Sequence, residues 1–362
     1  MRVETIYEFI RFSIDDQSQN FESFEDLDWE ALFDFAKRQA IVGVLFTGVE
    51  KMPMGKRPPK MILMNWFAMV ERVKAKNEEL NKAVIEVTTR FKKDGFPNCV
   101  LKGQGNALMY PNPALRMPGD IDLWPLAERE QIYQYVRKDF PKTEMLYHHL
   151  EYPILKGVMT EVHFFPMFLN NPLYNGRFQK WLKSISQQQC ENWVDLPQGT
   201  FSRPTDEFNL IYQLAHIRHH FFDEGVGMRQ LMDYYFLLRQ MESGKLNVER
   251  VKDTLRYLGL YKFAGAVMFV MHKVFGLASQ YLLVNPDEKI GTLLEEEVLM
   301  TGNFGHHDKR FGDLKKLSRP RRLLLLLKKN LRFGWYFPDE VACSFFFRLG
   351  QPIWRWWATL KY

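Results

Sequence analysis

The feature that most constrains the fold of this chain is a pair of aspartates, Asp120 and Asp122, behind a glycine-containing segment. If residues 120–124 form a β-strand, the two-residue period places both carboxylates on one face and Ile121 and Leu123 on the other. Two unpaired carboxylates held this close repel each other unless a divalent cation lies between them. The pair therefore predicts a small sheet that carries a metal site, with Asp120 and Asp122 as ligands.

The segment upstream of the pair predicts a phosphate-binding turn. Glycines without a Cβ let backbone N–H groups approach a phosphate closely, and a lysine and an arginine nearby add positive charge. The candidates for binding the polyphosphate are Lys102, Gly103, Gln104, Gly105, Asn106 and Arg116.

Glu161 supplies a third acid. We expect a hairpin with strands near 144–155 and 157–165 that turns around Lys156 and Gly157, and in the second strand Glu161 shares a face with His163. Glu161 then completes an acidic triad with the aspartates, as a third ligand or as the base for an attacking hydroxyl. An ion pair with a nearby Lys or Arg is the alternative interpretation.

Several histidines accompany these acids. His163 is either a hydrogen-bonded histidine packed beside an acid or a metal ligand. His216 and His220 have the i, i+4 spacing of zinc sites, but a glutamate does not follow the first histidine. A third ligand is also missing unless Asp233 or His148 approaches, so a structural or substrate-facing polar cluster is the simpler interpretation.

Two more groups of polar residues are candidates near the site. Arg229 and Asp233, at i and i+4, are expected to pair on one helix and to orient the histidine cluster. Tyr147, His148 and His149 lie on the strand opposite Glu161, as a surface strand edge or as substrate contacts.

Hydrophobic spacing indicates helices before and after this region. Apolar residues recur at helical spacing in 26–50, with Asp26 or Asp28 as a candidate N-cap, and in 60–93, which predicts one long amphipathic helix. Helical spacing returns at Thr205.

Between these helices, short apolar runs indicate strands at 98–102 and 120–124 and a helix at 127–138. We therefore expect an α+β fold in which a small mixed-sheet core is flanked by N-terminal and C-terminal helical regions. The expected parts are an N-terminal helical region at 1–94, the core at 95–204, a C-terminal helical domain at 205–314 and a basic aromatic tail at 315–362.

Charge and aromatic residues are concentrated in the tail. Residues 315–362 hold 11 Lys/Arg and 2 Asp/Glu, a net charge of +9 in a chain of net +6, so residues 1–314 sum to −3. Such a body is not a general polyanion binder, and we expect no specific nucleic acid partner. The tail's basic, Trp-rich composition suits an anionic membrane surface. The alternative is a helix that packs its Leu and aromatic face on the body with Lys and Arg outward.

Other features predict a cytoplasmic protein, with peripheral membrane contact through the tail as the open alternative. The cysteines Cys99, Cys190 and Cys343 show no CxxC pairing. The N-terminus is charged where a signal peptide would be apolar, and no apolar run approaches the roughly 18 residues of a membrane span.

Four segments together resemble one uncharacterised nucleotidyltransferase family of bacterial genomes, within the polymerase-β-like nucleotidyltransferase superfamily. The resemblance covers most of residues 30–275. The segments are Val100-Leu101-Lys102-Gly103, then Tyr110-Pro111-Asn112-Pro113-Ala114-Leu115-Arg116 with Gly119-Asp120-Ile121-Asp122, then Glu161-Val162-His163, and His216-Ile217-Arg218-His219-His220 with Gly227-Met228-Arg229-Gln230-Leu231-Met232-Asp233.

The resemblance implies a metal-dependent enzyme that moves an NMP from an NTP to a small-molecule or saccharide-type acceptor. Mg²⁺ or Mn²⁺ is the implied cofactor, and polysaccharide biosynthesis is the implied setting. NMP transfer to a protein and a non-catalytic member that binds a nucleotide or a partner at a membrane surface are the alternatives. One departure is that Gln104 or Asn106 stands where the superfamily has a serine after the glycine.

Overall fold

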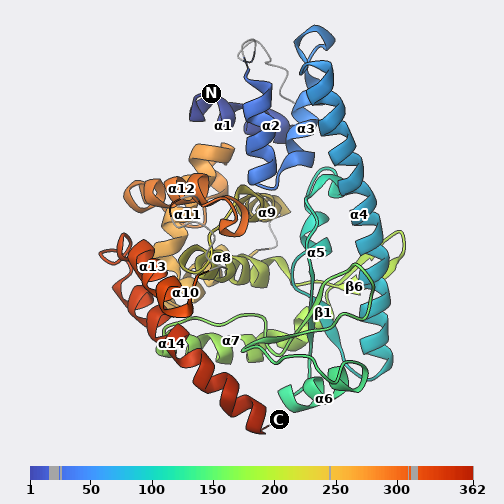
Figure 1. Cartoon of the computed structure of the whole chain (residues 1–362), viewed down its shortest axis with the longest axis vertical. Helices are drawn as coiled ribbons and strands as arrows, with labels where there is room; N and C mark the ends of the chain where they lie inside the picture. Colours follow the sequence, from blue (N-terminus) through green and yellow to red (C-terminus); the bar gives the residue numbers. More distant parts are fainter. Residues whose placement is uncertain (16–23, 25–26, 244–245, 309, 311–316, 362) are drawn as a thin grey trace.

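A small β-sheet lies between one long helix and the helices of the C-terminal half (Figure 1). The computed structural model describes residues 1–15, 24, 27–243, 246–308, 310 and 317–361. The fold is α+β, with a small mixed sheet and flanking helices, as the sequence predicts.

Three N-terminal helices confirm the helical spacing predicted for 26–50 and 60–93, and a further helix precedes them. They are α1 (Val3–Ile14), α2 (Trp29–Arg38), α3 (Val42–Lys51) and α4 (Lys60–Lys93). Asp28 caps α2, because its side chain accepts a hydrogen bond from the backbone N–H of Ala31. Asp26, the other candidate cap, lies outside the described residues.

The sheet has the strand order β1-β2-β4-β3. The strands are β1 (Asn98–Val100), β2 (Ile121–Pro125), β3 (His149–Glu151) and β4 (Thr160–His163). The β2–β4 pair is parallel, whereas β1–β2 and β3–β4 are antiparallel. β2 begins one residue later than predicted, so Asp120 directly precedes the strand.

The predicted hairpin at 144–155 and 157–165 is wrong in length. β3 and β4 pair over three residues each, and residues 152–159 connect them. Gly157 does adopt a left-handed backbone conformation, with φ of 78°, but it stands inside this longer connection. One further backbone hydrogen bond joins the two sides, from the N–H of Tyr152 to the carbonyl of Thr160 at 2.8 Å, and the apolar side chains of Tyr152 and Val158 are buried in the core.

Helices and a second hairpin complete the chain. The hairpin is β5 (Trp193–Leu196) with β6 (Gly199–Ser202). The helices are α5 (Gln104–Ala107), α6 (Arg129–Asp139), α7 (Pro172–Cys190), α8 (Asp206–Phe222), α9 (Met228–Arg239), α10 (Val248–Tyr257), α11 (Tyr261–Phe275), α12 (Glu288–Thr301), α13 (Arg319–Leu331) and α14 (Pro338–Lys361). No helix in the described part of the chain is long and apolar enough to cross a bilayer.

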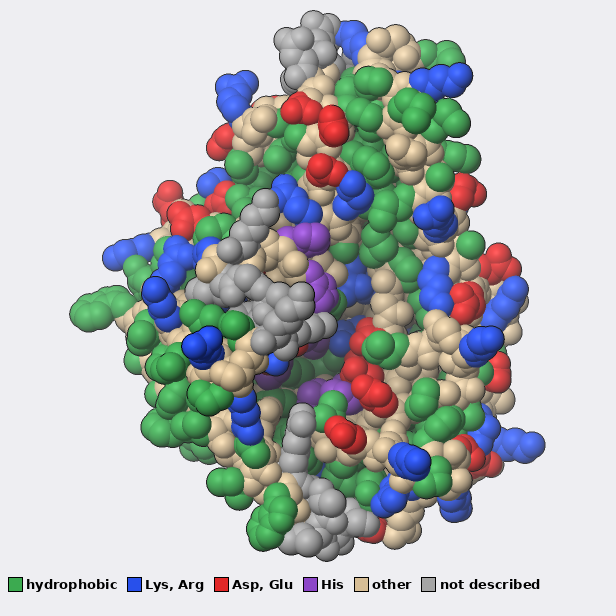
Figure 2. All heavy atoms as spheres, viewed as in Figure 1, with side chains coloured by type: hydrophobic (Ala, Val, Ile, Leu, Met, Phe, Trp, Pro, Cys, Tyr) green, Lys and Arg blue, Asp and Glu red, His purple; other side chains and the backbone are tan. Residues whose placement is uncertain are grey.

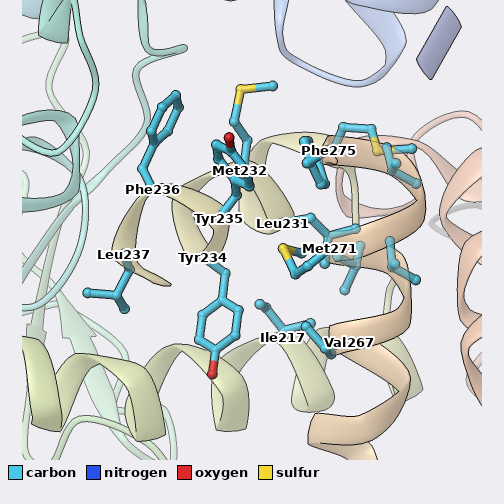
Figure 3. Packing of buried hydrophobic residues seen from close by; sticks show 14 of the residues in the cluster. Ile217, Leu231, Met232, Tyr234, Tyr235, Phe236, Leu237, Val267, Met271 and Phe275 are labelled. Atoms are coloured by element: carbon cyan, nitrogen blue, oxygen red, sulfur yellow. The ribbon is translucent and has the colours of Figure 1, made fainter. Parts of the chain in front are cut away.

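Two hydrophobic clusters hold these elements together. In the larger one, Leu231 of α9, Ile217 of α8 and Met271 of α11 point toward one another (Figure 3). The smaller one joins α4 and α6 to one face of the sheet through Leu123 and Val162. The opposite face of the sheet is therefore free to carry polar side chains.

The N-terminal and C-terminal helices share the larger cluster. The Tyr7 hydroxyl of α1 donates to Glu295 of α12 at 2.7 Å, and Gln39, directly after α2, donates to the carbonyl of Val298 at 3.0 Å. The division at 94, 204 and 314 stays a prediction.

We expect Gly43 to be intolerant of a side chain, because α3 packs there against the segment that leads into β2. A Cβ at Gly43 would lie 2.2 Å from the backbone oxygen of Leu115. Gly43→Ala should lower the free energy of unfolding, measured by chemical denaturation, by about 1–3 kcal/mol. The control is Gly176→Ala in α7, where a Cβ meets nothing within 4 Å and Ala should stabilise by about 0.5–1 kcal/mol. Equal stability of the two variants would contradict this packing.

Candidate active site

The parallel pairing of β2 and β4 brings the predicted acids together. Asp122 and Glu161 are register partners, so both side chains project from the sheet face opposite α4 and α6. Asp122, Glu161 and His163 each offer a ligand atom, and these atoms lie within 4.8 Å of one another. Figure 2 shows histidines and carboxylates gathered in the hollow at the centre of this face of the molecule.

Asp122 is the most buried of the acids, with 1% of its side chain exposed. Lys102 Nζ and His163 Nε2 each lie 3.0 Å from its Oδ1. Burial alone would raise the pKa of Asp122, but the Lys102 ammonium and the His163 hydrogen bond outweigh it and lower the pKa below its usual value. Asp122 is therefore ionised at neutral pH.

The same contacts act on Lys102 and His163 in return. Burial opposes the charge on His163, but its hydrogen bonds to Asp122 and Glu161 raise its pKa to about 9. Burial also opposes the charge on Lys102, yet the Asp122 carboxylate raises the pKa of this lysine above its usual range. Both are cations at neutral pH and balance the charge of the acids.

Asp120 lies at the junction of two hollows. It lines a cleft of about 480 Å³ together with Asp122 and Glu161. It also lines a smaller pocket of about 30 Å³ with Lys102 and Arg229. The group of close ligand atoms contains His163 in the place predicted for Asp120, so the role of Asp120 as a ligand stays a prediction.

The predicted phosphate turn runs along the smaller pocket. Gly103, at the start of α5, has a φ of 56°, and a Cβ there would lie 3.2 Å from the backbone oxygen of Asp120. A Cβ on Gly119 would lie 3.0 Å from Arg229 Nη1. Glycines at these two positions keep the backbone close to the acid and to the arginine.

Three predicted phosphate contacts make bonds inside the protein. Arg116 binds Asp233 through two hydrogen bonds, Nε–Oδ1 at 2.8 Å and Nη2–Oδ2 at 2.7 Å. The Asn106 amide donates to Asp233 Oδ2 at 3.2 Å, and the Gln104 amide donates to Asn81. Their contact with a phosphate stays a prediction.

The predicted pair of Arg229 and Asp233 is wrong, because Asp233 binds Arg116 instead. The Arg229 guanidinium lies over the ring of Phe304, 5.3 Å from its centroid, and donates to the carbonyl of Pro118 at 3.5 Å. Burial and the charge of Arg116 lower the pKa of Arg229, and its Nε has no partner among the described residues. A buried guanidinium of this kind is suited to an anionic ligand.

Histidines dominate the lining of the larger cleft. Seven of the chain's nine histidines line it: His148, His149, His163, His216, His219, His220 and His306. His216 Nε2 lies 3.0 Å from both His220 Nε2 and Lys102 Nζ, which makes the pair part of a polar cluster that reaches the acids. Burial lowers the pKa of His148 and His216 and lowers those of His149 and His219 to about 4.

The C-terminal helix α14 also lines the cleft, which the sequence reasoning missed. Phe347, Gln351 and Trp354 face it. Arg348 lies inward, 2.7 Å from Asp223 at the end of α8, whereas the alternative interpretation of the tail placed Lys and Arg outward. Residues 315, 316 and 362 of the predicted tail lie outside the described residues.

The comparisons with known proteins identify the family. The model of an uncharacterised nucleotidyltransferase family matches residues 25–276. The chain belongs to this family. No curated protein sequence matches the chain.

Among solved structures, the chain is similar to an antigenic nucleotidyltransferase-like protein from Paracoccidioides brasiliensis. The two share 13% sequence identity with a TM-score of 0.31, over 51% of this chain and 93% of that one. Because this similarity is so low, the assignment to the nucleotidyltransferases rests on the family match.

We expect the buried pair of Arg116 and Asp233 to be critical for stability. Arg116→Met leaves an ionised carboxylate buried, which should lower the free energy of unfolding by about 3–5 kcal/mol. The matched control is Lys82→Met, which breaks an exposed ion pair with Glu78 and should cost less than about 1 kcal/mol. Chemical denaturation measures both, and a loss in Arg116→Met as small as that in the control would contradict the assignment.

Proposed function

We propose that this nucleotidyltransferase uses Mg²⁺ or Mn²⁺ to move an NMP from an NTP to a small-molecule or saccharide-type acceptor. The observation that carries the proposal is the position of Asp122 beside Glu161 on the open sheet face, with Asp120 on the same cleft. Carboxylates placed in this way are what in-line phosphoryl transfer requires to hold its metal ions.

The acids fit a divalent cation. Asp122 Oδ2 is buried and has no hydrogen-bond partner among the described residues, and a buried carboxylate oxygen without a partner is costly. Carboxylate oxygens are the ligands that Mg²⁺ prefers. Asp120 and Asp122 would hold the ion with Glu161 as a further ligand, and the bound ion would neutralise charge on the polyphosphate.

On the other side of Asp120, the groups that line the smaller pocket, of about 30 Å³, suit contact with an oxygen of the polyphosphate. The half-buried Lys102 and the buried Arg229 bring two cations to its wall, and Gly103 and Gly119 leave the backbone accessible there. Arg116 contributes by fixing the turn through Asp233, a positioning role.

Glu161 is the candidate base for the attacking hydroxyl. Burial would raise its pKa, but the hydrogen bond with His163, whose Nε2 is 3.5 Å from Oε2, holds the pKa below its usual value. Glu161 is then ionised at neutral pH and able to accept a proton, while His163 holds its orientation.

The larger cleft suits a small acceptor. Its volume of about 480 Å³ lies in the range typical of small-molecule sites, and the rings of Tyr147 and Trp354, 5.2 Å apart, offer apolar faces. The net charge of −3 on residues 1–314 would not attract a long polyanion. These properties favour a sugar or sugar phosphate of the kind used in polysaccharide biosynthesis.

NMP transfer to a protein is the alternative acceptor class. Intact-mass measurement after incubation with NTP and Mg²⁺ separates the two, because a protein acceptor gains the mass of one NMP.

Asp122→Asn should abolish the transfer. With labelled NTP, Mg²⁺ and candidate sugar phosphates, we expect a loss of roughly 100-fold or more in rate, because electrostatic stabilisation of the transferring group is lost. Asp253→Asn is the matched control, since Asp253 is an exposed partner of Arg256 on α10. Turnover in Asp122→Asn equal to that of the control would refute the metal site.

We further propose that α13 and α14 contact an anionic membrane surface. Large apolar side chains project from one face of α14 at helical spacing: Phe346, Leu349, Ile353 and Trp356 are all exposed. Arg321, Arg322 and Lys328 are exposed on α13. An apolar face flanked by basic residues is suited to the headgroup region of anionic lipids.

Ile353→Glu should weaken binding to vesicles that contain phosphatidylglycerol, because it places a charge in the apolar face. Met61→Glu is the matched control on α4, because both side chains are 70% exposed. Vesicles of phosphatidylcholine alone should bind the wild type weakly. In a sedimentation assay, equal pelleting of Ile353→Glu and Met61→Glu, or no pelleting of the wild type, would disprove the contact.

A further inference from the structure

Three histidines at the edge of the sheet form a second group of possible ligands, which shares His163 with the carboxylate group. His149 in β3 and His163 in β4 are directly opposite each other in the antiparallel pair, so their side chains share a face of the sheet. His148 precedes β3 and turns its ring onto the same spot. Each ring offers a nitrogen, and these nitrogens lie within 4.8 Å of one another.

The rings contact one another closely. His148 Nε2 lies 3.2 Å from His149 Nδ1. The ring centroids of His148 and His163, and of His149 and His163, are 5.3 Å apart in each case. Three imidazoles therefore converge on a space of the size that one ion requires.

The hydrogen bonds of this group are incomplete. The contact between His148 and His149 has room for a single proton between two nitrogens. His163 Nδ1 is buried without a hydrogen-bond partner among the described residues. Buried polar atoms of this kind normally have a partner, and an exception calls for a ligand or an ion.

A carboxylate borders the group on its open side. Glu161 Oε1 lies 3.6 Å from His149 Nε2, and Glu161 Oε2 lies 3.5 Å from His163 Nε2. Three imidazoles are the protein ligands of a zinc site whose fourth position is open, and Glu161 lies beside that set. By contrast, the oxygen ligands of Asp120 and Asp122 suit Mg²⁺.

The geometry points to a second metal site, in which His148, His149 and His163 bind a transition-metal ion of the Zn²⁺ type beside the carboxylate pair. Such an ion ties β3 to β4 at the wall of the cleft. The inference does not depend on nucleotidyl transfer, since the site is tested without nucleotide.

Zinc binding to the chelator-treated full-length protein tests the proposal. Isothermal titration should give one tightly bound Zn²⁺ per chain, and Co²⁺ should produce the visible absorption of a site with imidazole ligands. His148→Ala and His149→Ala should each weaken Zn²⁺ binding roughly 100-fold. His307→Ala is the control, because His307 is exposed outside the cleft, and its affinity should equal that of the wild type.

Asp122→Asn separates this site from the carboxylate site. It should weaken Zn²⁺ binding less than either histidine variant, because Asp122 touches the group only through His163. If circular dichroism reveals a folding defect in the alanine variants, His148→Gln and His149→Gln replace them, with the same loss expected. Wild-type zinc affinity in the folded His148 and His149 variants, or no stoichiometric binding by the wild type, would overturn the proposal.

Discussion

The arrangement of the cleft depends on how the protein compensates the negative charge of two neighbouring acids in a buried sheet. Parallel pairing of β2 and β4 places Asp122 beside Glu161, and ionised carboxylates at this distance repel each other unless positive charge is close. Lys102 and His163 supply it at 3.0 Å from Asp122. Because Lys102 also contacts His216 of α8, charge compensation links the sheet to the helical half of the chain.

A second buried ion pair fixes the other wall of the site. Asp233 of α9 binds Arg116 and also accepts hydrogen bonds from Tyr110 and Asn106. These three partners belong to the segment that runs from the glycine turn to β2, so a single carboxylate on a helix fixes three points of that segment. The smaller pocket beside Asp120 exists because this segment is held against α9.

The sequence was sufficient to predict the α+β fold, α4 and β2 but not the length of the β3–β4 hairpin or the pairing of charges. The two-residue period of a strand placed Asp122 and Glu161 on the polar faces of their strands. Helical spacing predicted α4 with both of its end residues, Lys60 and Lys93. The partner of Asp233 was predicted as Arg229, four residues away, but is Arg116, which is 117 positions away. Spacing within one helix does not predict such a partner. In a buried site, the two hydrogen bonds of a bidentate arginine are stronger than a pairing between neighbours on the helix, wherever that arginine lies in the sequence. The inward position of Arg348 was missed for the same reason, since its partner Asp223 is remote in sequence.

The central claim is that Asp122 and its neighbouring acids hold a divalent cation that serves the nucleotide. Electron paramagnetic resonance of Mn²⁺ tests it most directly, because the signal of free Mn²⁺ falls as the ion binds. We expect a mixture of the wild type and ATP to bind Mn²⁺ more tightly than ATP alone binds it. A mixture of Asp122→Asn and ATP should bind Mn²⁺ no more tightly than ATP alone. Equal Mn²⁺ binding by the wild type and Asp122→Asn would contradict the account.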